Sequence, residues 1–221
     1  MSRHRRTTGK KLSILIVDDS SIIRNGLRRE LGDLGFNVKT ADEGRQALAL
    51  VGDQHFDLII SDIEMPFMDG FELCEQLKQS PSTQSIPVVM LSSHDSEEAI
   101  ERGFKVGAAA FITKSNARQE LRVRIEEVLN RALFLRERQV LVVDDSKMVL
   151  RIVSKGLAQA GFKVSVAEDG LQALEFLEKK TPDLILSDLH MPDMDGFQLC
   201  AALRANSNWS GIPFVVMSTA G

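Results

Sequence analysis

The chain has 221 residues, of which 43% are hydrophobic and 26% are charged, and its formal net charge is -4. These proportions are typical of soluble globular domains, and the length suggests one or two of them. No stretch approaches the ~20 consecutive apolar residues that a membrane-spanning helix needs. The apolar run behind the basic N-terminus, residues 12–17, is too short for a signal peptide. We therefore expect a cytoplasmic protein with no membrane partner.

Charge and cysteine content add two further expectations. Five of the 27 Lys and Arg residues lie in residues 1–11, so that 22 basic residues face 31 acidic ones in the rest of the chain. This predicts a disordered basic leader over residues 1–11, and the acidic remainder argues against a nucleic-acid site. Cys74 and Cys200 are too few for a disulfide framework, and we interpret both as small core residues.

The sequence contains an internal repeat, with one complete copy and one shorter copy of the same unit. Residues 18–20, Asp-Asp-Ser, recur at residues 144–146, an offset of 126 residues that then holds without insertion or deletion. A repeat of this length indicates two copies of a domain rather than a solenoid. We expect a first domain over residues 12–135, a short linker at 136–139 and a second domain over 140–221. The counterpart of residues 96–135 is absent from the second copy, so we expect an incomplete second domain in a piece of a longer protein.

The first copy alternates between two kinds of segment. Short apolar runs rich in β-branched residues predict buried strands at residues 12–17, 38–41, 57–61, 87–91 and 109–113. Apolar positions with helical spacing lie between them. One such stripe comprises Ile22, Ile23, Leu27, Leu31 and Leu34, and the last comprises Leu121, Ile125, Val128, Leu129 and Ala132. Gly35 suits the end of the first helix. Alternation of this kind predicts a doubly wound parallel sheet of five strands with helices on both faces.

Polar side chains follow four of these five strands. Asp18 and Asp19 come after the first strand, Asp62 after the third, Ser92 after the fourth and Lys114 after the fifth. Doubly wound sheets place their sites at this edge, beyond the carboxyl ends of the strands. Carboxylates crowded there would raise one another's pKa, and a divalent cation such as Mg²⁺ (or Mn²⁺) removes the conflict. One carboxylate could then act as a nucleophile and form an aspartyl-phosphate.

With these residues in place, the chain resembles two tandem receiver domains, CheY-like and flavodoxin-like in fold, of bacterial two-component response regulators. The resemblance rests on residues 17–19 (Val-Asp-Asp), 61–70 (Ser-Asp-Ile-Glu-Met-Pro-Phe-Met-Asp-Gly), 88–92, 107–108 and 111–114. It covers all of the first copy, and the second copy up to a truncation after its fourth strand. It implies a phosphoacceptor signalling module that a sensor histidine kinase or phosphotransfer protein phosphorylates. Such a module would control dimerisation, including a homodimer, or an output domain outside this chain, and is not itself an enzyme.

The resemblance also implies roles for individual residues. Asp62 and Asp188 match the phosphoacceptors. The matching metal ligands are the phosphoacceptors themselves, the acidic pairs and two backbone carbonyls, namely Asp18, Asp19, Glu64, Asp144, Asp145 and His190. Ser92 and Ser218 match the switch hydroxyl, Phe111 matches the switch aromatic, and Lys114 matches the phosphate-binding lysine.

Two departures from the family pattern stand out. The family usually has a proline after the lysine, with a cis peptide bond, where this chain has Ser115. A cis bond without proline costs roughly 2.5–4 kcal/mol, so this peptide could be trans. His190 replaces the Glu64 of the first copy beside the phosphoacceptor, which predicts different phosphoryl lifetimes in the two domains.

Two other functions stay open at this point. A Mg²⁺-dependent phosphatase would use the same carboxylates, metal and lysine, but such enzymes carry Asp-x-Asp on the first strand where this chain has Asp18-Asp19. The other alternative is a scaffold in which one receiver serves only for dimerisation or docking.

Overall fold

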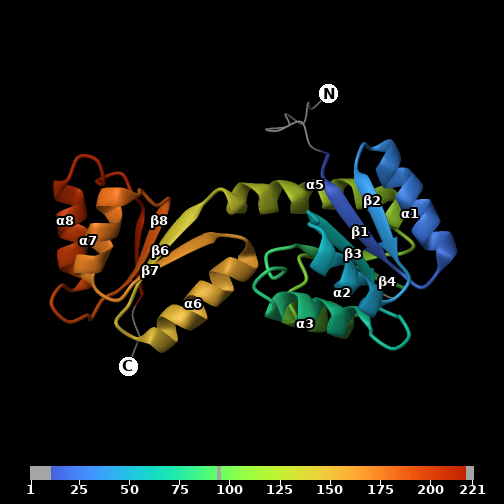
Figure 1. Cartoon of the computed structure of the whole chain (residues 1–221), viewed down its shortest axis with the longest axis horizontal. Coiled ribbons are helices and arrows are strands. Elements are labelled where there is room, and N and C mark those ends of the chain that lie inside the picture. Colours follow the sequence, from blue (N-terminus) through green and yellow to red (C-terminus); the bar gives the residue numbers. More distant parts are fainter. Residues whose placement is uncertain (1–10, 94–95, 218–221) are drawn as a thin grey trace. The chain divides into compact units, whose positions relative to one another are not determined.

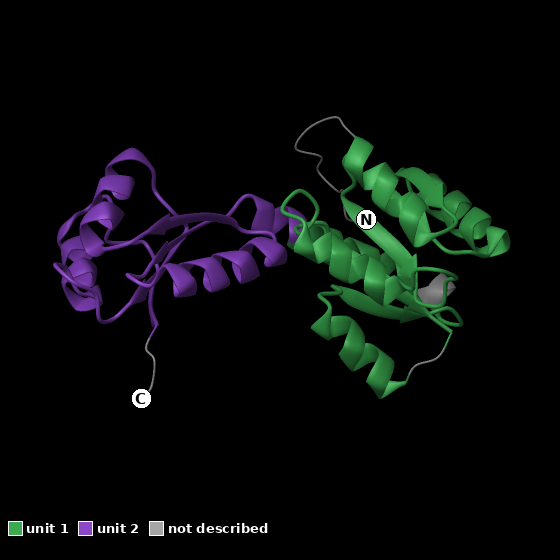
Figure 2. Ribbon diagram, turned by 60° about the horizontal axis from the view of Figure 1, so that its bottom comes forward, with its two compact units in different colours: residues 1–131 green, residues 132–221 purple. Residues whose placement is uncertain are grey.

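The structure is a computed structural model that describes residues 11–93 and 96–217. It divides into two compact units, residues 1–131 and 132–221 (Figure 2). Of the predicted leader, only Lys11 falls among the described residues, and it is exposed. In the described part of the chain, no helix is long and apolar enough to cross a membrane.

The first unit is a five-stranded parallel sheet in the order β2-β1-β3-β4-β5 (Figure 1). Its strands are β1 (Ser13–Val17), β2 (Asn37–Ala41), β3 (Leu58–Asp62), β4 (Val88–Ser92) and β5 (Ala110–Thr113). Its helices are α1 (Ser21–Asp33), α2 (Gly44–Asp53), α3 (Gly70–Gln79), α4 (Glu97–Lys105) and α5 (Ala117–Arg136), the last of which continues into the residues of the second unit. The predicted doubly wound sheet is therefore confirmed.

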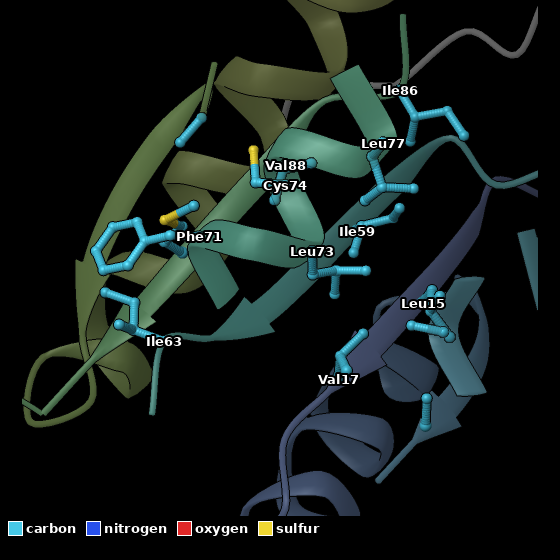
Figure 3. Packing of buried hydrophobic residues seen from close by; sticks show 14 of the residues in the cluster. Leu15, Val17, Ile59, Ile63, Phe71, Leu73, Cys74, Leu77, Ile86 and Val88 are labelled. Atoms are coloured by element: carbon cyan, nitrogen blue, oxygen red, sulfur yellow. The ribbon is translucent and has the colours of Figure 1, made fainter. Parts of the chain in front are cut away.

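Alternation along β1 explains the two helical layers. Leu15 and Val17 belong to a core packed under α2, α3 and α4, as Figure 3 shows for the side chains of α3. Ile14 and Ile16 point to the opposite face, which α1 and α5 cover. Successive strand residues point to opposite faces, so a strand of uniformly apolar residues is buried on both sides.

The stripe predicted on α1 is only partly correct. Leu27 and Leu31 are buried, but Ile22 is 83% exposed and Leu34 is 38% exposed. These two residues lie at the two ends of the helix, Ile22 in its first turn and Leu34 at its C-cap. Gly35 directly follows the C-cap residue and adopts φ +92°, a conformation that favours glycine.

The second unit repeats this plan with four parallel strands in the order β7-β6-β8-β9. Its strands are β6 (Gln139–Val143), β7 (Lys163–Ala167), β8 (Leu184–Asp188) and β9 (Phe214–Met217). Its helices are α6 (Lys147–Ala160), α7 (Gly170–Lys179) and α8 (Gly196–Ala205). Cys74 is fully buried on α3, whereas Cys200 on α8 is only half-buried.

Candidate phosphoryl-transfer site

The carboxylates predicted at the sheet edge lie together in the first unit. Asp18 and Asp19 follow β1, and Asp62 is the last residue of the neighbouring strand β3. One oxygen from each of the three carboxylates lies within 4.8 Å of the other two. The chain leaves β1 toward α1 on one face and leaves β3 toward α3 on the other, which opens the crevice typical of such sheets at this point.

Lys114 completes this cluster from the strand at the sheet edge. Its Nζ atom lies 2.7 Å from Asp62 Oδ2 and 3.2 Å from Asp18 Oδ2. The backbone N–H of Lys114 donates to the Ser92 carbonyl oxygen at 2.8 Å, which fixes the end of β5 against the end of β4. The peptide bond between Lys114 and Ser115 is trans, since the described residues contain no cis bond. The lysine therefore reaches the carboxylates without the family's usual proline.

The pKa values of Asp62 and Lys114 are both raised, but for different reasons. Asp62 is only 1% exposed. Burial raises its pKa, and the negative charge of Asp18 raises it further, against the lowering that the hydrogen bond from Lys114 produces. Burial alone would lower the pKa of Lys114, but the carboxylates of Asp62 and Asp18 outweigh it and raise that pKa. The cluster thus holds more negative charge than its lysine neutralises.

The donor set fits a hard divalent cation. Asp18 is fully buried, and its Oδ2 atom accepts no hydrogen bond from the described residues, although the Lys114 ammonium lies 3.2 Å away. That single ammonium is shared with Asp62, so the three carboxylates exceed the positive charge beside them, and a further cation would stabilise the buried oxygen. Asp19 is exposed and open to a water-coordinated ion. Oxygen ligands with access to water suit Mg²⁺.

The acidic cluster recurs in the second unit. Oxygens of Asp144, Asp145 and Asp188 lie within 4.8 Å of one another. Burial raises the pKa of Asp144, the hydrogen bond from the Ser146 backbone N–H lowers it, and the charges of Asp188 and Asp145 raise it further. The repeat offset aligns Lys114 with a position after residue 221, so the given sequence holds no counterpart of this lysine.

The remaining predicted site residues surround these clusters. Ser92 ends β4 and is 7% exposed. Glu64 is exposed and its backbone N–H lies 3.4 Å from Asp62 Oδ1, and His190 is exposed at the same place in the second unit. Phe111 is half-buried on β5, with its ring 5.9 Å from that of Phe104 on α4. Ser218 lies outside the described residues.

The sequence analysis missed one residue that contacts this site. A guanidinium N–H of Arg24, in the second turn of α1, donates to the backbone carbonyl of Asp18 at 2.5 Å. The repeat held a signal, because the offset aligns Arg24 with an apolar residue, Leu150, although the segments around them are otherwise similar.

Comparison with known proteins agrees with this geometry. The family model of the response regulator receiver domain matches residues 14–126 and again residues 140–221. The gliding motility regulatory protein of Myxococcus xanthus is 41% identical over 105 residues, which are 48% of this chain and 14% of that protein. The response regulator MprA of Mycolicibacterium vanbaalenii is 36% identical over 118 residues, which are 53% of this chain and 50% of that protein. The chain thus matches half or less of the length of these two relatives.

One solved structure resembles almost the whole chain. It is described as a putative two-component system response regulator/GGDEF domain protein. It is 27% identical, with a TM-score of 0.61, and the match covers 95% of this chain and 84% of that one. The similarity therefore extends across both repeats.

Proposed function

We propose a function for this chain from one premise, that it belongs to the response regulator receiver domain family, whose model matches both repeats. Each domain accepts a phosphoryl group on an aspartate in a Mg²⁺-dependent reaction, Asp62 in the first domain and Asp188 in the second. One observation supports this most strongly. The Lys114 ammonium lies 2.7 Å from Asp62 Oδ2 inside a cluster of three carboxylates at the sheet edge.

The transfer itself is a displacement at phosphorus. A carboxylate oxygen of Asp62 forms the new O–P bond while the N–P bond of a phosphohistidine on the donor breaks, and the departing imidazole keeps the electron pair and takes a proton. Asp18, Asp19 and Asp62, with the Glu64 carbonyl, would hold Mg²⁺, which supplies positive charge to the phosphoryl oxygens. The protein's own contribution is to hold the nucleophile in a fixed, buried position.

Three further residues of the first domain would respond to the phosphoryl group. Lys114 would exchange its ion pair with Asp62 for a charge-assisted hydrogen bond to a phosphoryl oxygen. The Ser92 hydroxyl, at the end of the neighbouring strand, would donate to another oxygen. Phe111, on the strand beside Ser92, would change its packing as that strand end moves. Together these shifts would move the domain between two conformations.

In the second domain, Asp188 is the proposed acceptor. Asp144 and Asp145, with the carbonyl of His190, would hold its metal, and Ser218 matches the switch hydroxyl. The exposed imidazole of His190 replaces the carboxylate of Glu64 beside the acceptor. This difference supports unequal phosphoryl lifetimes in the two domains, which we would measure as decay rates of the two aspartyl-phosphates.

The partners follow from this chemistry. The donor is a sensor histidine kinase or a phosphotransfer protein in the cytoplasm. Phosphorylation would control a homodimer or an output domain, and the receiver itself would catalyse only its own phosphorylation and dephosphorylation. A scaffold role, in which one receiver only docks, is the alternative for a domain whose aspartate accepts no phosphate.

Labelling with acetyl phosphate and Mg²⁺ tests the proposal. Intact-mass measurement should find up to two added phosphoryl groups in the wild-type chain, one in Asp62→Asn and one in Asp188→Asn, and none in the double variant. Omitting Mg²⁺ should abolish the labelling. An unlabelled wild-type chain would contradict the proposal for both domains. An Asp188→Asn variant that gains as many phosphoryl groups as the wild type would show that Asp188 accepts none. The second domain would then have the scaffold role.

A further inference from the structure

The second turn of α1 reaches back to the acidic pair. Arg24 is half-buried, and its NH1 donates to the Asp18 carbonyl oxygen at 2.5 Å. A guanidinium is always charged and presents its N–H groups in a rigid plane, so a contact of this kind fixes direction as well as distance. Arg24 therefore ties the helix to the turn that carries the predicted metal ligands.

Three hydrogen bonds together fix Asp18. Its backbone N–H donates to the Ala41 carbonyl at 3.3 Å, and its Oδ1 accepts from the Ser20 backbone N–H at 2.8 Å. The contact from Arg24 adds the backbone carbonyl as a third point. The one oxygen left over is Oδ2, the buried atom that faces Lys114 and accepts no hydrogen bond from the described residues. The three contacts thus aim Oδ2 at the site.

The second domain provides a natural comparison. Asp144 keeps the first two contacts, since its N–H donates to Ala167 at 3.2 Å and its Oδ1 accepts from the Ser146 N–H at 2.8 Å. The residue aligned with Arg24 is Leu150, which is 6% exposed and packs in the core with Val140 and Val142. A leucine side chain has no donor, so the third contact cannot form from that position.

The helix starts differ as well. The Ser146 hydroxyl accepts a hydrogen bond from the Val149 N–H and caps α6, but Ser20 makes no side-chain cap on α1. Arg24 therefore supplies a side-chain link from α1 to its preceding turn, whereas α6 has an ordinary side-chain N-cap.

We propose that Arg24 is a positioning residue for the metal site of the first domain: it holds Asp18 so that Oδ2 points at the ion, and the second domain lacks this device. The inference rests on the proposed metal site. Charge alone would act in the opposite direction, because a nearby guanidinium repels a divalent cation. Loss of Arg24 therefore weakens metal binding if the residue positions Asp18 and strengthens it if only its charge matters.

The test is a titration of the full-length chain with Mn²⁺, with free ion counted by electron paramagnetic resonance. All proteins carry Asp145→Asn to weaken the second site. Arg24→Met keeps the length of the stem and removes the donors, and Arg28→Met on the same helix removes the same charge from an exposed position. We expect Arg24→Met to raise the Kd by about threefold to tenfold, which is less than the full contribution of a charged hydrogen bond because Arg24 acts on the ion only through Asp18, with Arg28→Met within about twofold of the parent. Arg24→Lys, which restores a donor with poorer geometry, should fall between them.

Each outcome decides a different point. Equal affinities in Arg24→Met and Arg28→Met, or tighter binding in Arg24→Met, overturn the role of Arg24 and leave the metal site intact. A parent protein that binds no Mn²⁺, or binds it equally well with Asp19→Asn added, overturns the metal site itself and the inference with it. Circular dichroism establishes whether each variant is folded. If Arg24→Met is unfolded, the metal affinity of Arg24→Lys decides whether Arg24 positions Asp18.

Discussion

The Lys114 ammonium lies 2.7 Å from Asp62 Oδ2, yet this contact does not compensate for the burial of the carboxylate. Burial and the charge of Asp18 leave the pKa of Asp62 above its ordinary value of 3.8 even with the lysine in place. The folded domain thus binds the Asp62 proton more tightly than the unfolded chain does. Ionisation of Asp62 therefore destabilises the metal-free fold, and a cation or a phosphoryl group with its cation relieves that cost.

The first prediction concerns the stability of Asp62→Asn. Because the folded-state pKa of Asp62 is raised, the destabilisation is absent below about pH 3.8, grows as the pH rises through the folded-state pKa and is complete above it. The asparagine variant carries no such charge, so we expect its first domain to be more stable than the wild type at pH 7. The difference should disappear as the pH falls below 3.8.

The same pair of proteins tests the role of the metal. Mg²⁺ at 100 times its Kd should stabilise the wild-type first domain by about 2.7 kcal/mol and the variant by less. Hydrogen exchange of peptides from β1 and β3 is the suitable measurement, since the single tryptophan, Trp209, lies in the second unit. A variant less stable than the wild type at pH 7 without Mg²⁺ would show that the ion pair with Lys114 dominates instead.

Gly70 supports the second prediction. A Cβ atom at this position would lie 2.2 Å from the Asp62 carbonyl oxygen and 2.9 Å from the Ile63 Cα, both backbone atoms that a side-chain rotation cannot move. We expect Gly70→Ala to destabilise the first domain by about 1–3 kcal/mol and to slow phosphorylation, because the phosphoacceptor itself is displaced.

A matched control exists on α1. A Cβ at Gly26 would meet nothing within 4 Å, so Gly26→Ala should be neutral or stabilise the helix by up to about 1 kcal/mol. Gly196, whose Cβ would lie 2.4 Å from the Asp188 carbonyl oxygen, should reproduce the Gly70 effect in the second domain. Rates of labelling by acetyl phosphate and hydrogen exchange give the two readouts. Normal stability of Gly70→Ala would mean that the α3 start can shift freely.

The acidic site was predictable because it depends on features that leave a pattern in sequence. Buried strands of a parallel sheet are short apolar runs, and their carboxyl ends share one edge, so the sequence alone places Asp18, Asp62 and Lys114 together. The repeat strengthened that inference, since Asp144 and Asp188 follow the same strands. Gly35 was likewise recognisable from its position after an apolar helix.

Contacts between long side chains and backbone carbonyls could not be predicted in the same way. Arg24 and Lys78 each donate to backbone carbonyls, and neither apolar periodicity nor a motif reveals which carbonyl a long side chain will reach. The apolar stripe predicted on α1 also included two residues that are not buried. Ile22 and Leu34 fit the helical period but lie exposed at the two ends of α1, and the period of a helix does not show which of its turns are buried.

Lys78 is the subject of the third prediction. This α3 lysine is 7% exposed and donates to the carbonyls of Gln84 and Ile86 at 2.8 and 2.7 Å. In the second domain Arg204 takes its place, with NH1 at 2.7 and 3.0 Å from the carbonyls of Ser210 and Ile212. We expect Lys78→Met to cost about 1–3 kcal/mol, since it leaves buried acceptors without this donor, and Lys78→Arg to cost clearly less.

Burial lowers the pKa of Lys78, which gives this prediction a pH signature. The folded domain releases the proton more readily than the unfolded chain, so wild-type stability should rise as the pH increases from the folded-state pKa to 10.5. Lys78→Met should lack that rise. Thermal unfolding of both proteins between pH 7 and pH 10.5 measures this pH dependence of stability. Hydrogen exchange of peptides from the first unit assigns the change to the first domain. Parallel pH profiles for the two proteins would refute this account of Lys78.

The last prediction concerns Gly103 on α4 and the ring of Phe111. A Cβ at Gly103 would lie 2.1 Å from Phe111 Cε2 and 2.3 Å from Cζ, so the half-buried ring keeps its position only because residue 103 has no side chain. Gly103→Ala should displace the ring outward and destabilise the first domain by about 1–3 kcal/mol. In the background of Phe111→Ala, the same substitution should cost much less, since the ring is gone and the close neighbour that remains is Met90 Sδ at 3.1 Å, on a flexible side chain. A double-mutant cycle, with the stability of each variant measured by hydrogen exchange, gives the coupling free energy between the two positions. A coupling near zero would mean that α4 moves to accept the methyl group and that the glycine does not control the ring.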